Sequence, residues 1–335
     1  MRRGRLWLGI GVATLATVGL ARAFICGPHD ATTPPAPTQS GPTMDAERLR
    51  AHVRMLSETL HPRDSTHPQN LDRAADYIAD HLASAGGSVE RHSLSFSASG
   101  PSFTNISARF GPEDGERLIV GAHYDAAPGT PGADDNASGV AALLELAVLL
   151  GRNPPPLRVD LVAYTLEEPP YFGTPTMGSA MHARKLRDDG VKVRGMLALE
   201  MLGCYSDVPG SQKYPLPVLG LRYPDTGLFI GVVGKPGDGG LTDAVAGAMR
   251  AGSPLPVESL VAPAMVPGVA LSDHASFWEQ GFRAVMVTDT AYFRNPRYHT
   301  SDDTWDSLDY VRMAHAVQAV YAAVRTLASG SLPGN

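Results

Sequence analysis

Hydrophobic residues recur at helical spacing in three stretches of the chain. The first stretch follows Asp45, a residue type that caps helices, and extends to Leu60. The second runs from about Leu71 to Leu82 and ends at a Gly-Gly pair, and the third runs from Val140 to Leu150. Each stretch places its apolar side chains on one face, so the sequence predicts three amphipathic helices.

Strand patterns lie between and after these helices. Residues 89–96 and 104–110 have the composition of strands, and five shorter apolar runs are typical of buried parallel strands: 118–122, 159–165, 196–199, 228–233 and 284–288. Strands that alternate with helices predict one α/β domain, with a mostly parallel mixed central sheet covered by helices on both faces. The polar, proline-rich stretch 203–227 shows no period, and such an excursion often borders an active site.

The N-terminus has the pattern of a targeting segment. Arg2, Arg3 and Arg5 precede an uncharged apolar stretch over 6–21, and residues 21–23 (Ala-Arg-Ala) resemble a cleavage site. We predict that 1–26 is a signal peptide or an N-terminal membrane anchor, 27–44 a proline-rich linker and 45–330 the catalytic domain. Both alternatives for 1–26 stay open, because the apolar stretch is somewhat shorter than the roughly 20 residues of a spanning helix. Either one predicts export to a periplasmic or extracellular location, with possible membrane attachment.

Charge and cysteine content limit the classes of function. The chain of 335 residues has 28 Lys and Arg against 34 Asp and Glu, a formal net charge of −6. This acidic balance argues against nucleic-acid binding, which uses a basic surface. Two cysteines exclude both a disulfide framework and a cysteine-based zinc ribbon, and we expect Cys204 to be a small buried side chain. No feature of the sequence indicates an obligate protein partner.

Histidines and carboxylates follow the predicted strands, at the sheet edge where α/β proteins bind ligands. They are His123 with Asp125, Asp134-Asp135 at the start of a helix, Glu167-Glu168, Glu200, and His299 with Asp302 and Asp303. Each group alone has a structural explanation. The Asp134-Asp135 pair can cap a helix, and Asp302 and Asp303 have the pattern of a solvated turn. Together, at neighbouring strand ends, the set favours a divalent metal site.

These motifs resemble those of the co-catalytic dizinc exopeptidases. The shared order is His-x-Asp, Gly-x-x-Asp-x-x-Ser-Gly, Glu-Glu, Leu-Glu-Met and Tyr-His-Thr, with Ser272-Asp273-His274 and Phe277-Trp278 also included. The resemblance covers about residues 45–328. That family includes bacterial secreted leucyl aminopeptidases, glutamate carboxypeptidase II and, more distantly, glutaminyl cyclases. The resemblance implies the zinc-dependent exopeptidase (phosphorylase/hydrolase-like) fold, two zinc ions per chain and peptide substrates.

The resemblance also implies a role for each motif residue. Asp135 would bridge two zinc ions, and the peptide bond between Asp135 and Asn136 would be cis. His123 and Glu200 would complete one zinc site, while Glu168 and His299 would complete the other. Asp125 would orient His123, and Glu167 would be the general base that takes a proton from a water shared by the two metals. Tyr205, Tyr292 and Asn295 are candidates for a further hydrogen-bond donor to the reacting carbonyl oxygen.

Several functions fit this pattern. The leading interpretation is an aminopeptidase. Several family aminopeptidases carry aspartate where this chain has Asn136 and Glu200, which leaves the substrate class open. One alternative is a glutaminyl-cyclase-like aminoacyltransferase that uses one zinc. Another is a carboxypeptidase, in which Arg294 or Arg297 would hold the substrate carboxylate although both are expected at the surface. A non-catalytic scaffold is the weakest alternative, because every ligand position and the base are present.

Overall fold

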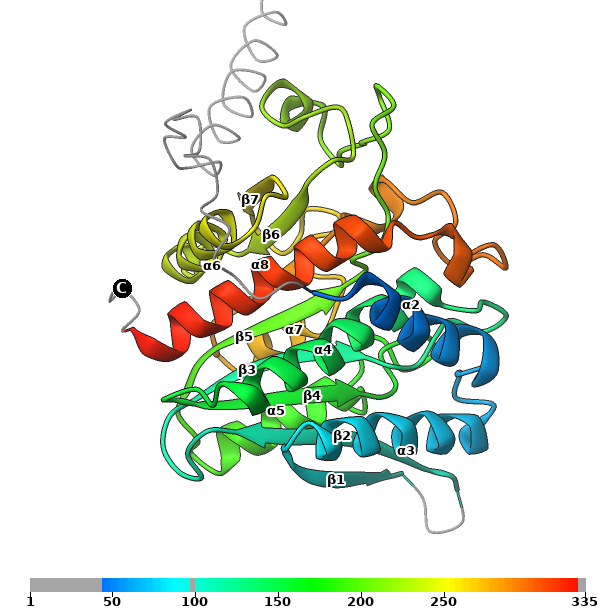
Figure 1. The fold of residues 1–335 in the computed structure, drawn as a ribbon, viewed down its shortest axis with the longest axis vertical. Coiled ribbons are helices and arrows are strands. Elements are labelled where there is room, and N and C mark those ends of the chain that lie inside the picture. The colour runs from blue at the N-terminus through cyan, green and yellow to red at the C-terminus, as the bar shows by residue number, and fades with distance from the viewer. Residues whose placement is uncertain (1–43, 97–99, 331–335) are drawn as a thin grey trace, which may run out of the picture.

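A computed structural model describes residues 44–96 and 100–330 of the chain (Figure 1). The predicted targeting segment and all of the linker except Met44 lie outside these residues. The described part contains one sheet of eight strands in the order β1-β2-β4-β3-β5-β8-β6-β7. The strands are β1 Ser88–Ser95, β2 Ser102–Phe110, β3 Arg117–His123, β4 Arg158–Tyr164, β5 Val193–Glu200, β6 Ile230–Gly234, β7 Val257–Val261 and β8 Ala284–Thr288.

Helices cover both faces of this sheet, as the sequence predicts. They are α2 Ala46–Arg54, α3 Pro68–Ser84, α4 Gly139–Arg152, α5 Gly178–Asp188, α6 Gly239–Gly252, α7 His274–Glu279 and α8 Tyr310–Ser329. One apolar core joins α2, α3, α4, α6 and α8 to the sheet. A second, smaller core includes Leu186 of α5 and Phe277 of α7, packed against Ile119 and Met196 of the strands. The two cores show a three-layer arrangement (Figure 1).

The predicted helix starts and strand runs agree with the structure in most places. Asp45 caps α2, where its carboxylate accepts hydrogen bonds from the backbone N–H groups of Glu47 and Arg48. The expectation that the run over 228–233 is a parallel strand is confirmed on one side only. It forms β6, which pairs parallel with β7 but antiparallel with β8. Chain direction depends on the connection between strands, which an apolar run does not encode.

The central strands bring their carboxyl ends to one edge of the sheet. β4, β3, β5 and β8 are neighbours, and each adjacent pair among them is parallel. The residues that follow these strands therefore lie at the same edge. On one side of this parallel block lie β2 and β1, and on the other side lie β6 and β7.

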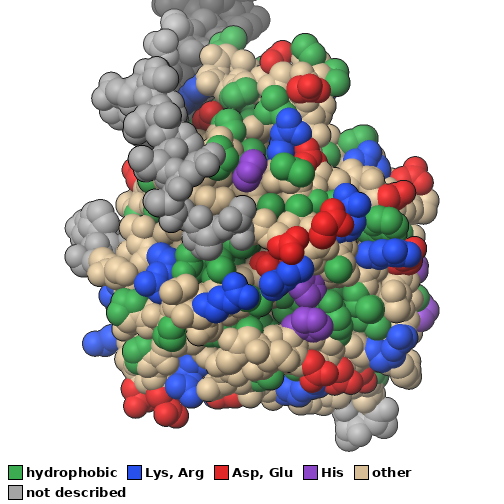
Figure 2. Space-filling model, viewed as in Figure 1, with side chains coloured by type: hydrophobic (Ala, Val, Ile, Leu, Met, Phe, Trp, Pro, Cys, Tyr) green, Lys and Arg blue, Asp and Glu red, His purple; other side chains and the backbone are tan. Residues whose placement is uncertain are grey.

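Within residues 44–96 and 100–330, no helix combines the length and the apolarity needed to cross a bilayer. On the face shown in Figure 2, basic and acidic side chains are interspersed rather than gathered by sign.

Close contact between α4 and the end of α3 depends on a glycine. A Cβ added at Gly151 would lie 1.8 Å from the backbone carbonyl oxygen of Ala85. Replacing Gly151 by alanine must therefore push the two helices apart, and we expect it to lower the free energy of unfolding by roughly 1–3 kcal/mol. Urea denaturation measures this change.

Gly247 of α6 is the matched control. It is exposed, and a Cβ there would meet no atom within 4 Å. Gly247→Ala should raise the free energy of unfolding by about 0.5–1 kcal/mol, because alanine restricts the unfolded chain and favours helix. If Gly151→Ala also raised the free energy of unfolding, the close contact with Ala85 would not be the reason for glycine at position 151.

Candidate metal centre

The two histidines and four of the carboxylates singled out in the sequence meet at the carboxyl edge of the sheet. His123 ends β3 and Glu200 ends β5, while the adjacent residues Glu167 and Glu168 follow β4. Asp135 lies in the turn before α4, and His299 comes from the loop after β8. Parallel pairing of β3 with both β4 and β5 makes their ends adjacent, so side chains far apart in sequence reach one point.

Asp135 lies between the two histidines. Its Oδ1 is 3.2 Å from Nε2 of His123, and its Oδ2 is 3.1 Å from Nε2 of His299. Each histidine also faces a glutamate on its own side: Nε2 of His123 is 3.4 Å from Oε2 of Glu200, and Nε2 of His299 is 3.3 Å from Oε2 of Glu168. The arrangement is two half-sites that share one carboxylate.

Several buried atoms of these half-sites have no hydrogen-bond partner among the described residues. They include Nε2 of His123, Oδ1 of Asp135 and Oε1 of Glu168. Buried polar atoms are almost always paired, because leaving one unpaired costs roughly 1–3 kcal/mol. Three groups of described residues have ligand atoms within 4.8 Å of one another, and two of them belong to these half-sites: His123 with Glu167 and Glu200, and Asp135 with Glu168 and His299. Imidazole and carboxylate donors aimed at a shared point fit two divalent metal ions.

The electrostatics of the site show how strongly its acids need positive charge. Burial raises the pKa of Glu167 well above its usual value, with Glu168 and Glu200 adding to the rise and His123 opposing it. Burial and the nearby Asp135 raise the pKa of Glu168 to about 7. Burial acts to lower the pKa of His299, but its hydrogen bonds with Asp135 and Glu168 raise that pKa to about 10. Protons and a metal ion would therefore compete for the same nitrogen and oxygen lone pairs at this site.

Two buried aspartates hold the turns that carry these groups. The carboxylate of Asp125 accepts the backbone N–H groups of Glu167 at 3.2 Å and Glu168 at 3.0 Å. Its backbone carbonyl lies 3.2 Å from Nδ1 of His123, closer than its carboxylate at 3.6 Å. Asp125 thus contacts His123 mainly through the main chain, while its side chain fixes the glutamate pair.

Asp303 holds the turn around Asp135 in the same way. Its two carboxylate oxygens accept the backbone N–H groups of Asp134 at 2.9 Å and Asp135 at 3.1 Å. The expectation that Asp303 belongs to a solvated turn is wrong, because its side chain is fully buried, whereas Asp302 is exposed. Asp303 follows His299 by four residues, so it ties the loop of one histidine to the shared carboxylate.

Asn136 and Ser272 position Glu200. The side-chain amide of Asn136 donates to the carbonyl of Leu199 at 2.8 Å, and its Oδ1 accepts the N–H of Met201 at 3.0 Å. Ser272 donates its hydroxyl to Oε2 of Glu200 at 2.7 Å. Asn136 therefore contacts the backbone on both sides of Glu200 rather than the acids. The peptide bond between Asp135 and Asn136 is cis, as the resemblance implies.

Arg63 is a supporting residue that the sequence gives no reason to select. Its side chain is fully buried and donates to four backbone carbonyls, those of Leu56, Tyr124, Pro131 and Gly132. Three of these carbonyls, those of Tyr124, Pro131 and Gly132, belong to the segments that lead into Asp125 and Asp135. One guanidinium thus holds together the backbone segments that precede Asp125 and Asp135. Most of these contacts lie more than 60 residues away in sequence, so no local pattern near Arg63 predicts them.

Backbone conformations that non-glycine residues seldom adopt gather at this edge. Leu166, directly before the glutamate pair, has φ 61°, Met201, directly after Glu200, has φ 52°, and His299 itself has φ 56°. Such left-handed conformations cluster at functional sites because the surrounding contacts hold them. Here the neighbouring hydrogen bonds to Asn136 and Asp125 provide those contacts.

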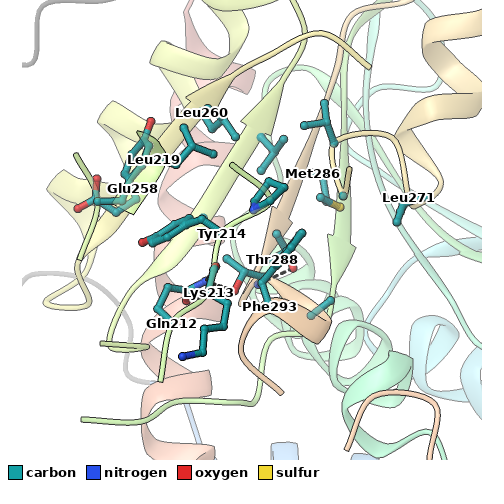
Figure 3. Close-up of a pocket in the computed structure, with 18 of the residues that line it drawn as sticks. Gln212, Lys213, Tyr214, Leu219, Glu258, Leu260, Leu271, Met286, Thr288 and Phe293 are labelled. Carbon is teal, nitrogen blue, oxygen red and sulfur yellow. Dashed lines mark hydrogen bonds between the residues drawn. The ribbon is translucent and has the colours of Figure 1, made fainter. Parts of the chain in front are cut away.

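An apolar cavity opens beside Glu200 (Figure 3). Its volume is about 100 Å³. The walls come from β6 and β8 and from the predicted excursion, which contributes Gln212, Lys213, Tyr214 and Leu219 (Figure 3). Met286 and Leu260 are among its apolar lining residues. The expectation that the polar excursion borders the site therefore agrees with the structure.

Tyr298 also lines this cavity and was not selected from the sequence. Its ring stacks on the imidazole of His299, with 3.9 Å between centroids and 14° between planes. Burial, with Asp135, Glu200 and the glutamate pair nearby, raises the pKa of Tyr298, so the hydroxyl stays protonated. The adjacency of Tyr298 to a candidate ligand could have signalled this position.

The three donors proposed from the sequence lie less favourably. Asn295 donates to Oδ2 of Asp134 at 2.7 Å and is engaged there. Tyr205 is partly buried, and its pKa is raised chiefly by burial and then by Asp289, outside the two half-sites. Tyr292 lies at the cavity wall and is 40% exposed. Of the tyrosines, Tyr298 has its ring directly against a candidate ligand.

Two further expectations need correction or refinement. Arg294 is buried, not exposed, and donates to the carbonyls of Cys204 and Phe229. Arg297 donates to the carbonyl of Ser307. Neither arginine lines the cavity, so neither is placed to hold a substrate carboxylate there. Cys204 is buried, as expected.

Comparisons with known proteins show the family and the fold. The profile described as Peptidase family M28 matches residues 105–324. The uncharacterised protein YfbL of Escherichia coli (strain K12) is 44% identical over 295 residues, covering 86% of this chain and 88% of that protein. A leucine aminopeptidase precursor from Bacteroides thetaiotaomicron has a similar fold, with a TM-score of 0.64 and 19% identity over 86% of this chain and 99% of that chain. A glutaminyl cyclase from the same organism, bound to N-acetylhistamine, matches with a TM-score of 0.64 and 19% identity over 85% of this chain and 99% of that chain.

The role of Asp303 leads to a prediction with a neighbouring control. In Asp303→Asn the amide can accept only one of the two backbone N–H groups and directs its own N–H toward the other. The turn around Asp135 should shift, and affinity for a divalent metal should fall about tenfold, as it does when orienting partners of ligands are removed. Metal titration followed by calorimetry measures this. Asp302→Asn, one residue away but exposed, should leave the affinity unchanged; equal losses in both variants would contradict the proposed positioning by Asp303.

Proposed function

Because the chain belongs to peptidase family M28, we propose that it is an exported zinc metallopeptidase that removes N-terminal residues from peptides. The observation that carries this proposal is the shared position of Asp135, with one carboxylate oxygen toward each histidine. In the proposed assignment His123 and Glu200 hold one zinc, Glu168 and His299 hold the other, and Asp135 contacts both.

Two bound zinc ions would lower the pKa of the attacking water and offset negative charge on the reacting oxygens. Glu167 is the proposed general base. It lies beside this point without being the nearest partner of either histidine, since its Oε2 is 3.9 Å from Nε2 of His123. Its carboxylate would take the proton from the attacking water and give it to the nitrogen of the departing amine. The hydroxyl of Tyr298 is available to donate to the carbonyl oxygen as that oxygen gains charge.

The cavity supports an aminopeptidase with an apolar first residue. It opens at Glu200 and has the capacity of roughly one large side chain, so it suits the side chain at a chain terminus. Among the described residues that line it, the only lysine or arginine is Lys213, which is exposed. A site that binds a C-terminal carboxylate would place a cation beside the reacting groups, as a partner for the charge.

Export is proposed from the N-terminal sequence. Arg2, Arg3 and Arg5 followed by an apolar stretch favour translocation of the following domain, whether 1–26 is cleaved or stays as an anchor. The predicted linker would then separate the catalytic domain from the membrane or be the N-terminal end of the mature protein.

Substrate tests with one variant examine this proposal. The full-length protein should release the first residue from peptides with a free amino terminus, leave N-blocked peptides intact and lose activity with a chelator. Glu167→Gln should lower kcat at least a hundredfold while retaining the metal content of the unchanged protein, because the amide keeps the shape but cannot accept a proton. Peptide cleavage and metal content are measured on the same samples.

Contrary outcomes separate the alternatives. Cleavage of N-blocked substrates only would contradict an aminopeptidase, and cyclisation of an N-terminal glutamine without hydrolysis would identify a cyclase. Full activity in Glu167→Gln would remove this residue from the mechanism. Loss of metal in that variant would instead show that Glu167 is a ligand, as its position near His123 and Glu200 also permits.

A further inference from the structure

Three aromatic side chains lie on the opposite side of the metal centre from the apolar cavity. Phe96, Phe103 and Tyr171, here the aromatic trio, contact one another with ring centroids 5.9–6.3 Å apart. Phe103 is buried and Tyr171 is partly buried, while Phe96 is 40% exposed. The exposed face of Phe96 makes this an open surface rather than a closed pocket.

The aromatic trio is continuous with the residues of the metal centre. The N–H of Tyr171 donates to the carbonyl of Glu168 at 3.0 Å, which makes a tight turn directly after the candidate ligand. The antiparallel register of β2 with β4 pairs Ile106 with Ala163. Phe103 lies three residues before Ile106 and Leu166 lies three residues after Ala163, so both lie beyond the same end of this pairing. The trio therefore lies at the same sheet edge, next to Glu167 and Glu168.

The strand order gives the three features a linear arrangement. The trio belongs to the side of β1 and β2, the metal centre lies over β4, β3 and β5, and the cavity lies over β8, β6 and β7. A peptide that enters the cavity with its first side chain reaches the metal centre with its first carbonyl. The chain beyond that carbonyl then leaves toward β2 and β1, the side of the sheet on which the aromatic trio lies.

Shape distinguishes the two ends of this line. The cavity is a small apolar space that can accept one side chain, whereas a departing peptide has to continue into solvent. An open aromatic surface suits the second requirement. Aromatic rings bind apolar and aromatic side chains through their large contact area and preferred edge-to-face or offset geometries.

We propose that the aromatic trio binds the side chain of the residue that follows the scissile bond, and so makes the protein prefer peptides whose second residue is large and apolar. This inference rests on the proposed aminopeptidase function. It assigns the specificity for the leaving part of the substrate to residues whose side chains are not among the proposed metal ligands. It also fixes the direction in which the peptide crosses the sheet edge.

Two substitutions that introduce opposite charges at Phe96 provide the test. The substrates are free-amino peptides that begin with leucine and carry Phe, Ala, Arg or Asp as the second residue. The unchanged protein should cleave the Phe peptide with a kcat/KM about tenfold above that of the Ala peptide. Phe96→Glu should favour Arg over Asp, and Phe96→Lys should favour Asp over Arg, each by about two- to fivefold, as expected for exposed ion pairs.

Matched controls separate this effect from general damage. Val311 of α8 is also an exposed apolar residue, at 62%, on a helix that supplies no residue of the aromatic trio. Val311→Glu and Val311→Lys should keep the second-residue preference of the unchanged protein. Leucine amide, which has no second side chain, should be cleaved by both Phe96 variants at nearly unchanged rates, and this also shows that they fold.

The outcomes distinguish this inference from the proposed function. Reciprocal shifts at the second residue support the role of the aromatic trio. Cleavage of all peptides with the same second-residue preference in both Phe96 variants would overturn it while leaving the aminopeptidase proposal intact. No cleavage of any free-amino peptide by the unchanged protein would contradict the proposed function itself.

Discussion

Many carboxylates are buried together at one edge of the sheet, and the rest of the site is organised around their need for positive charge or hydrogen-bond donors. A buried carboxylate without a partner is strongly disfavoured, and adjacent carboxylates raise one another's pKa. The buried carboxylates of this structure fall into two groups, which differ in what stabilises them. Asp125 and Asp303 are satisfied by backbone N–H groups of neighbouring turns. Asp135, Glu168 and Glu200 face histidines and keep lone pairs free, which is the condition for binding metal.

This division links stability to function. Asp125 and Asp303 accept backbone hydrogen bonds and so fix the turns. Those turns position the carboxylates that remain free to bind metal. Arg63 adds further support, because its guanidinium donates to backbone carbonyls of the segments that lead into Asp125 and Asp135. Removing a holding residue should therefore weaken metal binding without touching a ligand. Binding energy from metal would in turn stabilise the folded state, since the assembled cluster exists only there.

The sequence predicts the parts of this structure that local patterns determine. Apolar runs mark the central strands, Asp45 marks the start of α2, and strand ends locate the histidines and acids. β7 is missed because Glu258 and Ser259 interrupt its apolar run. Asp303 is misjudged because its burial depends on a turn 168 residues away, while its neighbours in sequence are polar. The aromatic trio is missed for the same reason, because its three residues meet only through the order of the strands, whereas Tyr298 is adjacent in sequence to the candidate ligand His299.

The central claim is that two metal ions share Asp135. Zinc titration of the metal-free protein, followed by calorimetry and by elemental analysis after dialysis, tests this most directly. The account predicts two ions per chain in the unchanged protein and loss of both high-affinity sites in Asp135→Ala, because that carboxylate faces both histidines. A single ion per chain, or two ions retained at full affinity in Asp135→Ala, would contradict it.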